Sequence, residues 1–142
     1  MGVQKVMYYA HGWYLAERGE PLIRQDFQAW RLGPVQKLVW DCFRSFGSGY
    51  VDARASKFDL VTRVATEVCE KIPADTSEFL RQIVLGYGHI DAFELSNMTH
   101  ERGGPWDQVW NAPNGQITLG MRISHESIRR HFQLARRIRP TS

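Results

Sequence analysis

The N-terminal stretch constrains the fold of this chain more than any other feature, because it is apolar on almost every side. Between residues 3 and 16 lie Val6, Met7, Tyr8, Tyr9, Ala10, Trp13, Tyr14, Leu15 and Ala16. A helix that is hydrophobic around its whole circumference has to be covered by other elements. We therefore predict a buried central helix over residues 3–18, ending before Gly19. Gly12 lies inside it at a cost of about 1 kcal/mol relative to alanine, which predicts that a neighbouring element approaches closely there.

The length of the chain fits one domain built around that helix. Its 142 residues are within the size range of a single core, and 43% hydrophobic and 23% charged residues are typical of a globular protein. No internal repeat, low-complexity tract or linker divides the sequence. We expect residues 1–142 to form one compact, mainly α, single-domain helical bundle with a short β-strand or hairpin element.

Gly33-Pro34 marks the start of a second predicted helix. Proline suits the first helical position, because its missing N–H has no intrahelical partner there. An apolar stripe with spacings of three and four residues follows from Val35 to Phe46. Ahead of this helix, residues 27–30 fit a short strand that is too brief to build a sheet alone.

Capping patterns locate the remaining helices. Asp75 begins a capping-box pattern ahead of an apolar face that includes Val84 and runs to Tyr87, and Ser124 is the predicted cap of the C-terminal helix. Short helices are expected after residues 91 and 104, with Phe93 facing inward. Residues 48–74 fit two structures, because their apolar spacing suits a helix and their β-branched content suits a hairpin. We favour the helix and keep the hairpin as the alternative.

No segment of the sequence predicts a membrane location. No run of 18 apolar residues is present, and the first residues lack the apolar stretch and cleavage site of a signal peptide. Cys42 and Cys69 form no CxxC pair and are expected to be buried thiols in a reducing compartment. We expect a cytoplasmic protein without a membrane partner.

Positive charge is concentrated near the C-terminal end. Residues 122–139 carry six arginines and one acid, Glu126, whereas the whole chain has a net charge of only +3. Helical phase turns four of these side chains outward: Arg129, Arg130, Arg136 and Arg137. Such a face is a solvated surface, a contact for an acidic protein partner, or a contact for nucleic-acid phosphates. Nucleic acid is disfavoured, because no helix-turn-helix spacing precedes this helix and the rest of the chain is net acidic.

His100 and Glu101, with Asp107 close by in sequence, are the most enzyme-like residues. A metal-dependent hydrolase needs several ligands and a group that activates water. The spacing fits no zinc motif, because HExxH and CxxC are absent and a helix break separates His89 from His100. We expect no catalytic residue, metal or cofactor, and keep a small metal-dependent hydrolase using these three residues as the alternative. His11, inside the central helix, is interpreted as a hydrogen-bonded core histidine.

A series of motifs resembles one known family. Lys5-Val-Met-Tyr-Tyr-Ala-His-Gly-Trp-Tyr-Leu-Ala16 is similar to the K-L-L-Y-Y-A-Q-G-W-Y-L-A signature of the Panacea, or SocA-like, domain, formerly a domain of unknown function. Further motifs recur in the family's order: Glu20-Pro-Leu22, Ala29-Trp-Arg-Leu-Gly-Pro-Val35, Tyr87-Gly88, Glu94-Leu95, Thr99-His-Glu101, Gly104-Pro-Trp106 and residues 123–128. Each motif is weak alone, but their order over nearly the whole chain is specific.

The resemblance implies a mainly helical antitoxin domain of a kind paired with many unrelated toxins, including versions in phages and prophages. Members neutralise a toxin by direct contact, and some resemble adaptors that deliver the toxin to a protease. The resemblance implies no established catalytic residues. The implied partners are a toxin and, in the adaptor alternative, a protease. Its Trp-Arg-x-Gly-Pro-Val and Thr-His-Glu/Gly-Pro-Trp stretches are implied to shape the fold by packing on one another. The motif residues with this structural role are Trp13, Trp30, Gly33, Pro34, His100, Glu101, Pro105 and Trp106.

The sequence departs from the family pattern at its beginning. Members carry roughly 15–20 residues, the length of one helix, ahead of the Lys-Leu-Leu-Tyr-Tyr motif, whereas this sequence begins almost at the motif. Either an upstream start codon was missed or this version is shortened. In the shortened version, one side of the central helix is expected to be exposed at Met7, Tyr8 and Ala10 and to bind a partner or a second copy in a homodimer. Met7 and Tyr8 therefore join the four arginines as predicted partner-binding residues.

Overall fold

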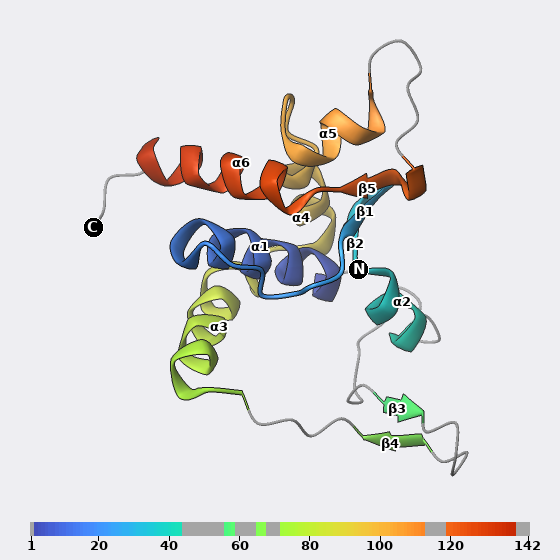
Figure 1. The fold of residues 1–142 in the computed structure, drawn as a ribbon, viewed down its shortest axis with the longest axis vertical. Coiled ribbons are helices and arrows are strands. Elements are labelled where there is room, and N and C mark those ends of the chain that lie inside the picture. The colour runs from blue at the N-terminus through green and yellow to red at the C-terminus, as the bar shows by residue number, and fades with distance from the viewer. Residues whose placement is uncertain (1, 44–55, 59–64, 68–71, 113–118, 139–142) are drawn as a thin grey trace.

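Helix α1 (Gly2–Arg18) is at the centre of the fold in the computed structural model of this chain. The structure describes residues 2–43, 56–58, 65–67, 72–112 and 119–138. Ten of the 17 residues of α1 are buried. It contacts α3 (Ala74–Tyr87), α4 (Ala92–Thr99) and α6 (His125–Ile138), and Figure 1 shows α6 and α3 on opposite sides of it. The predicted buried central helix is confirmed.

Short strands complete a fold that is mainly α, as predicted. Strands β1 (Phe27–Trp30), β2 (Gly33–Val35) and β5 (Arg122–Ile123) form an antiparallel sheet in the order β2-β1-β5. The other described elements are short: β3 (Ser56–Phe58), β4 (Ala65–Glu67), α2 (Lys37–Phe43), α5 (Pro105–Trp110) and the 3₁₀ helix η3 (Leu119–Met121). Because β5 pairs with β1, the sheet places the start of α6 beside the N-terminal part of the chain.

Helices α1 and α6 pack closely at Gly12. A Cβ atom at this position would lie 2.2 Å from Cε2 of Phe132, so no side chain fits between the helices. Phe132 is 2% exposed, and its ring meets those of Tyr8 and Trp13 edge-on, with centroids 5.7 and 5.0 Å apart. Such edge-to-face contacts are favourable geometries for aromatic pairs. The close approach predicted from Gly12 is confirmed.

Tyr8 is a core residue, so the expectation that it is exposed is wrong. Its side chain is 3% exposed, and its ring centroid lies 5.6 Å from that of Phe27 in β1. Ala10 is also buried, and Met7 packs partly buried against the same cluster. The sequence left this side of α1 without a neighbour, but β1 and α6, both distant along the chain, cover it.

Pro34 lies in a strand, so the prediction that it opens a helix is wrong. It pairs with Ala29 in the β1–β2 ladder, and α2 begins only at Lys37. In the described sheet β2 is an edge strand, where the missing N–H of proline removes no ladder hydrogen bond. Of the apolar stripe predicted after Pro34, Val35 is buried in β2, but Leu38 in α2 is 57% exposed and Cys42, an expected buried thiol, is also exposed.

The segment 48–74 contains a hairpin where it is described. Strands β3 and β4 pair antiparallel, with Lys57 opposite Thr66. The favoured helix is therefore wrong for these strands, and the alternative hairpin is confirmed there. β-branched and aromatic residues favour strands, and these two strands contain one of each, Thr66 and Phe58. Most of the other apolar positions behind the helix prediction, and Cys69, lie outside the described residues.

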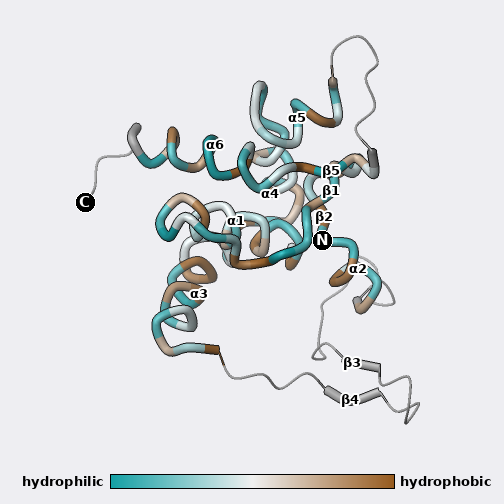
Figure 2. The backbone as a smooth tube through the Cα atoms, in the orientation of Figure 1, coloured by the Kyte–Doolittle hydropathy of each residue, from teal (hydrophilic) through white to brown (hydrophobic). Residues whose placement is uncertain are grey.

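Helix α6 begins where its predicted cap places it. Hydrophilic residues predominate along α6 (Figure 2), and the Ser127 N–H donates to the Ser124 hydroxyl at 3.1 Å. Asp75 makes no cap bond; α3 begins one residue before it, so the predicted capping box is wrong. Two side chains predicted to face inward are exposed instead, Val84 at 57% and Phe93 at 71%.

Candidate functional site

The family-like motifs meet at a junction between β1, β2, α4 and α5. The Trp106 indole N–H donates to the Trp30 carbonyl at 2.7 Å. The His100 imidazole stacks on the Trp106 indole with ring centroids 3.9 Å apart. In the same region the Ser96 hydroxyl donates to the Leu32 carbonyl. The Trp-Arg-x-Gly-Pro-Val stretch therefore packs on the Thr-His-Glu/Gly-Pro-Trp stretch.

Lys5 is buried inside this junction. Its ammonium group donates to the Pro34 carbonyl at 2.9 Å, and the residue is 0% exposed. Burial away from water lowers the pKa of Lys5 to about 8, because the charged form loses its hydration. Gly33 has φ 123°, and a Cβ there would lie 2.6 Å from Thr99 Oγ1 and 3.0 Å from Lys5 Cε. The glycine leaves room for both side chains, so α1, β2 and α4 pack closely together at these three motif residues.

His100, Glu101 and Asp107 do not converge on one point. Glu101 Oε2 lies 3.3 Å from His131 Nε2, whereas Asp107 accepts hydrogen bonds within its own turn. His100 Nε2 is buried and has no hydrogen-bond partner among the described residues. Burial and the nearby Lys5 charge lower the pKa of His100. Within the described ranges no three His, Cys, Asp or Glu side chains are grouped so that they could hold a metal ion, which the hydrolase alternative requires.

His11 is a hydrogen-bonded core histidine, as predicted. The Ile23 N–H donates to its Nδ1 at 3.3 Å, so its proton lies on Nε2, which faces His125 Nδ1 at 3.0 Å. The His125 Nε2 in turn donates to the Arg24 carbonyl at 2.9 Å. Burial, and secondarily His125, lowers the pKa of His11 to about 4. These hydrogen bonds of the two imidazoles tie the first turn of α6 to α1 and to residues 23 and 24.

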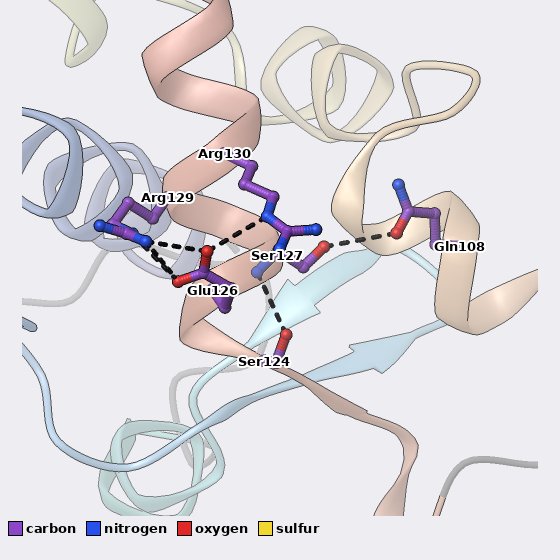
Figure 3. Close-up of polar contacts among 6 residues, drawn as sticks. All are labelled: Gln108, Ser124, Glu126, Ser127, Arg129 and Arg130. Atoms are coloured by element: carbon purple, nitrogen blue, oxygen red, sulfur yellow. Dashed lines mark hydrogen bonds and ion pairs between the residues drawn. The ribbon is translucent and has the colours of Figure 1, made fainter.

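Helix α6 carries the arginines predicted to bind a partner, but two of them are paired. Figure 3 shows Glu126 between Arg129 and Arg130, with N···O distances of 2.7 and 3.1 Å. Their side chains are 38% and 77% exposed. Arg136 is also exposed, and the side chain of Arg137 is outside the described part of the chain. Glu126 therefore reduces the positive charge of this face at its N-terminal end.

A cleft of about 380 Å³ beside α6 was not predicted from the sequence. Residues of α1, α4 and α6 line it, with Tyr87 from the end of α3 and residues 101, 104 and 105 from the turn before α5 and its first position. The Trp13 indole N–H donates to the Tyr87 hydroxyl at 2.7 Å, and the Tyr87 ring stacks on Tyr9 at 4.4 Å between centroids. Glu101 and His131 supply a carboxylate and an imidazole to its lining. The one available signal was the type of residue in α1, because Tyr and Trp combine an apolar body with a polar tip that suits a partly wet site.

Comparison with known protein families matches residues 3–107 to the family described as "Antitoxin SocA-like, Panacea domain". The chain belongs to this family. It is 35% identical to Antitoxin SocA of Caulobacter vibrioides (strain NA1000 / CB15N) over 133 residues, which cover 94% of this chain and 71% of that protein. No solved structure gives a significant match.

The Panacea assignment covers the motif junction. Residues from Lys5 to Trp106 lie within the matched range, whereas α6 and its arginines follow it. Membership of this family and the similarity to an antitoxin support an antitoxin-type role, and they favour protein binding over catalysis. None of the described helices combines the length and hydropathy needed to cross a membrane.

Proposed function

We propose that this chain is an antitoxin that neutralises a cognate protein toxin by direct contact. The observation that carries the proposal is the 35% identity with Antitoxin SocA over 94% of the chain. The buried polar side chains are consistent with this role, because Lys5 and His11 form hydrogen bonds that join elements of the fold. In this role residues 1–142 act as one domain, through the shape and charge of its surface.

The outer face of α6 is the toxin-binding surface in this proposal. Arg130 and Arg136 are exposed, Arg129 flanks them, and the sequence pattern adds Arg137. Leu134 is 59% exposed and offers an apolar contact among these charges. Arginine binds carboxylates through paired hydrogen bonds, and a charged face accelerates association with a complementary partner. We therefore expect an acidic surface on the toxin opposite α6.

Co-expression tests the proposal. The product of a neighbouring gene is expressed alone and together with this chain, and we expect growth arrest alone, restored growth together and co-purification of the two proteins. Restored growth without any physical complex would refute direct neutralisation. A toxin that disappears from the cells on co-expression, instead of accumulating in a complex, would favour the protease-adaptor hypothesis.

Charge reversal tests the surface. Replacing Arg129, Arg130, Arg136 and Arg137 with glutamate should abolish toxin binding while the far-UV circular dichroism is unchanged. The matched control is Arg81→Glu on α3, an exposed arginine that also pairs with a glutamate of its own helix. Unchanged affinity in the α6 variant would discard that face as the toxin-binding surface.

A further inference from the structure

The cleft beside α6 combines aromatic walls with a polar rim. Trp13 and Tyr87, which are only partly buried, contribute accessible rings to its lining, and Asn97 and Glu101 lie at its exposed edge. The Glu101 side chain is 65% exposed, so its carboxylate is accessible from solvent. A partner side chain that enters the cleft therefore passes the carboxylate before it reaches the rings.

The charge of the cleft favours a cation. Among its described lining residues, Glu101 is the single carboxylate and neither Lys nor Arg is present. The faces of aromatic rings carry negative potential and attract a cation within about 6 Å of the centroid. His131 Nε2, 3.3 Å from the Glu101 carboxylate, helps to hold that group at the cleft. A site that combines aromatic rings with a carboxylate favours a side chain that carries a cation at the end of a long apolar stem.

An arginine of the chain occupies a similar arrangement in a neighbouring groove, which shares Trp13 and Tyr87 with the cleft. The Arg18 guanidinium lies over the rings of Tyr14 and Phe79, 4.8 and 5.5 Å from their centroids. Its Nη1 atom is 3.2 Å from an Asp75 carboxylate oxygen. Two rings and one carboxylate thus hold an arginine in this protein, and the cleft beside α6 offers the same groups.

We propose that the cleft beside α6 binds an arginine side chain presented by the protein partner. The proposal rests on the function proposed above and names the chemistry of a second contact with the toxin. The arginine stem packs along the rings, and its guanidinium meets Glu101. Arginine fits better than lysine, because its planar group both stacks on rings and binds a carboxylate through two hydrogen bonds. The antitoxin would then bind a toxin that has an acidic patch opposite α6 and one arginine beside it more tightly than it binds a uniformly acidic protein.

Small ligands test the cleft without any toxin. N-acetyl-arginine amide and its uncharged isostere N-acetyl-citrulline amide are titrated into the ¹⁵N-labelled full chain, and the indole N–H resonance of Trp13 is followed by NMR. This group donates to the Tyr87 hydroxyl and therefore reports on the cleft. We expect a saturable shift with the arginine ligand at about millimolar concentration. Binding of the citrulline ligand should be about fivefold weaker, because it lacks the cation.

Glu101→Gln removes the carboxylate charge and keeps the shape of the side chain. In this variant we expect the preference for the arginine ligand over the citrulline ligand to fall to about twofold or less, because only the rings still attract the cation. Glu78→Gln is the matched control, because Glu78 is 55% exposed, pairs with Arg81 and does not line this cleft. The proposal would be overturned if the wild type bound both ligands equally, or if the arginine preference were undiminished in Glu101→Gln. Tighter binding of N-acetyl-glutamate amide would refute it. Equal shifts at all five tryptophan indoles would also overturn it.

The toxin complex separates this inference from the proposed function. Glu101→Lys places a cation at the cleft and should weaken toxin binding about tenfold, whereas Glu78→Lys should leave it unchanged. Full toxin affinity in Glu101→Lys would refute the arginine contact and leave the antitoxin function intact. A wild-type chain that rescues no growth would refute the antitoxin function, and the small-ligand titration would still decide the chemistry of the cleft.

Discussion

Substitution of Gly12 measures how closely α1 and α6 are held together. In Gly12→Ala the new Cβ would lie 2.2 Å from Phe132 Cε2, whereas carbon atoms in contact lie about 3.5–4.0 Å apart. The helices would have to separate by more than about 1 Å, because Phe132 is 2% exposed and enclosed by other rings. Overpacking of a core costs about 1–3 kcal/mol, and the large overlap places this case at the upper end. Since alanine regains about 1 kcal/mol of helix propensity, we expect a net loss of about 2 kcal/mol.

Gly86→Ala is the matched control. Gly86 also lies inside a helix, but a Cβ there would have nothing within 4 Å, so we expect a gain of up to about 1 kcal/mol. Urea unfolding followed by circular dichroism gives both free energies, provided that the m-values agree. Adding Phe132→Leu to Gly12→Ala should recover part of the loss, because the overlapping ring atoms are gone. If both alanine substitutions stabilised the protein equally, the close packing of α1 and α6 would be refuted.

Other contacts give further predictions in the same assay. Ser124→Ala should cost about 1 kcal/mol, because the first turn of α6 loses its cap, whereas Ser124→Asp should retain most of the stability. Gly33→Ala should cost about 3 kcal/mol or more, because it combines a φ of 123° with a Cβ 2.6 Å from Thr99 Oγ1; an unchanged midpoint would contradict this packing. The pKa of His11 falls from 6.5 to about 4 on folding, so the unfolded chain takes up the proton first and stability decreases as pH falls through this range. The decrease should reach about 3 kcal/mol, and His11→Gln should remove it; the same pH dependence in both proteins would show that His11 is not its source.

The sequence is informative about elements whose structure is decided locally. Apolar residues lie on nearly every side of α1, which indicates a buried helix. Gly12 within this helix indicates that a neighbouring element approaches closely. Ser124 caps α6 through the Ser127 N–H three residues away, which is a local interaction. Pro34 shows the limit of this reasoning. Its strand conformation depends on pairing with Ala29 and on the buried Lys5 ammonium, and neither appears in the local pattern.

The proposed surfaces were predictable to different degrees. The basic face of α6 follows from helical phase, and even the pairing of Glu126 with Arg129 and Arg130 fits their spacing of three and four residues. The cleft does not follow from any pattern, because its lining comes from α1, the end of α3, α4 and α6. The burial of Tyr8 escapes prediction for the same reason, since Phe27 and Phe132, which cover it, are distant along the chain.

Buried and exposed residues of this chain are under different physical constraints. Lys5 fills the space beside Gly33 within the motif junction, so any side chain at position 33 would displace Lys5 and disturb its bond to the Pro34 carbonyl. Arg130, Leu134 and Glu101 are exposed, and substitutions at exposed positions usually change stability by less than about 0.5 kcal/mol. The proposed contact residues are therefore able to vary while the scaffold is kept. Under the proposed function, a change of toxin would then need substitutions only on α6 and at the rim of the cleft, without refolding of the core.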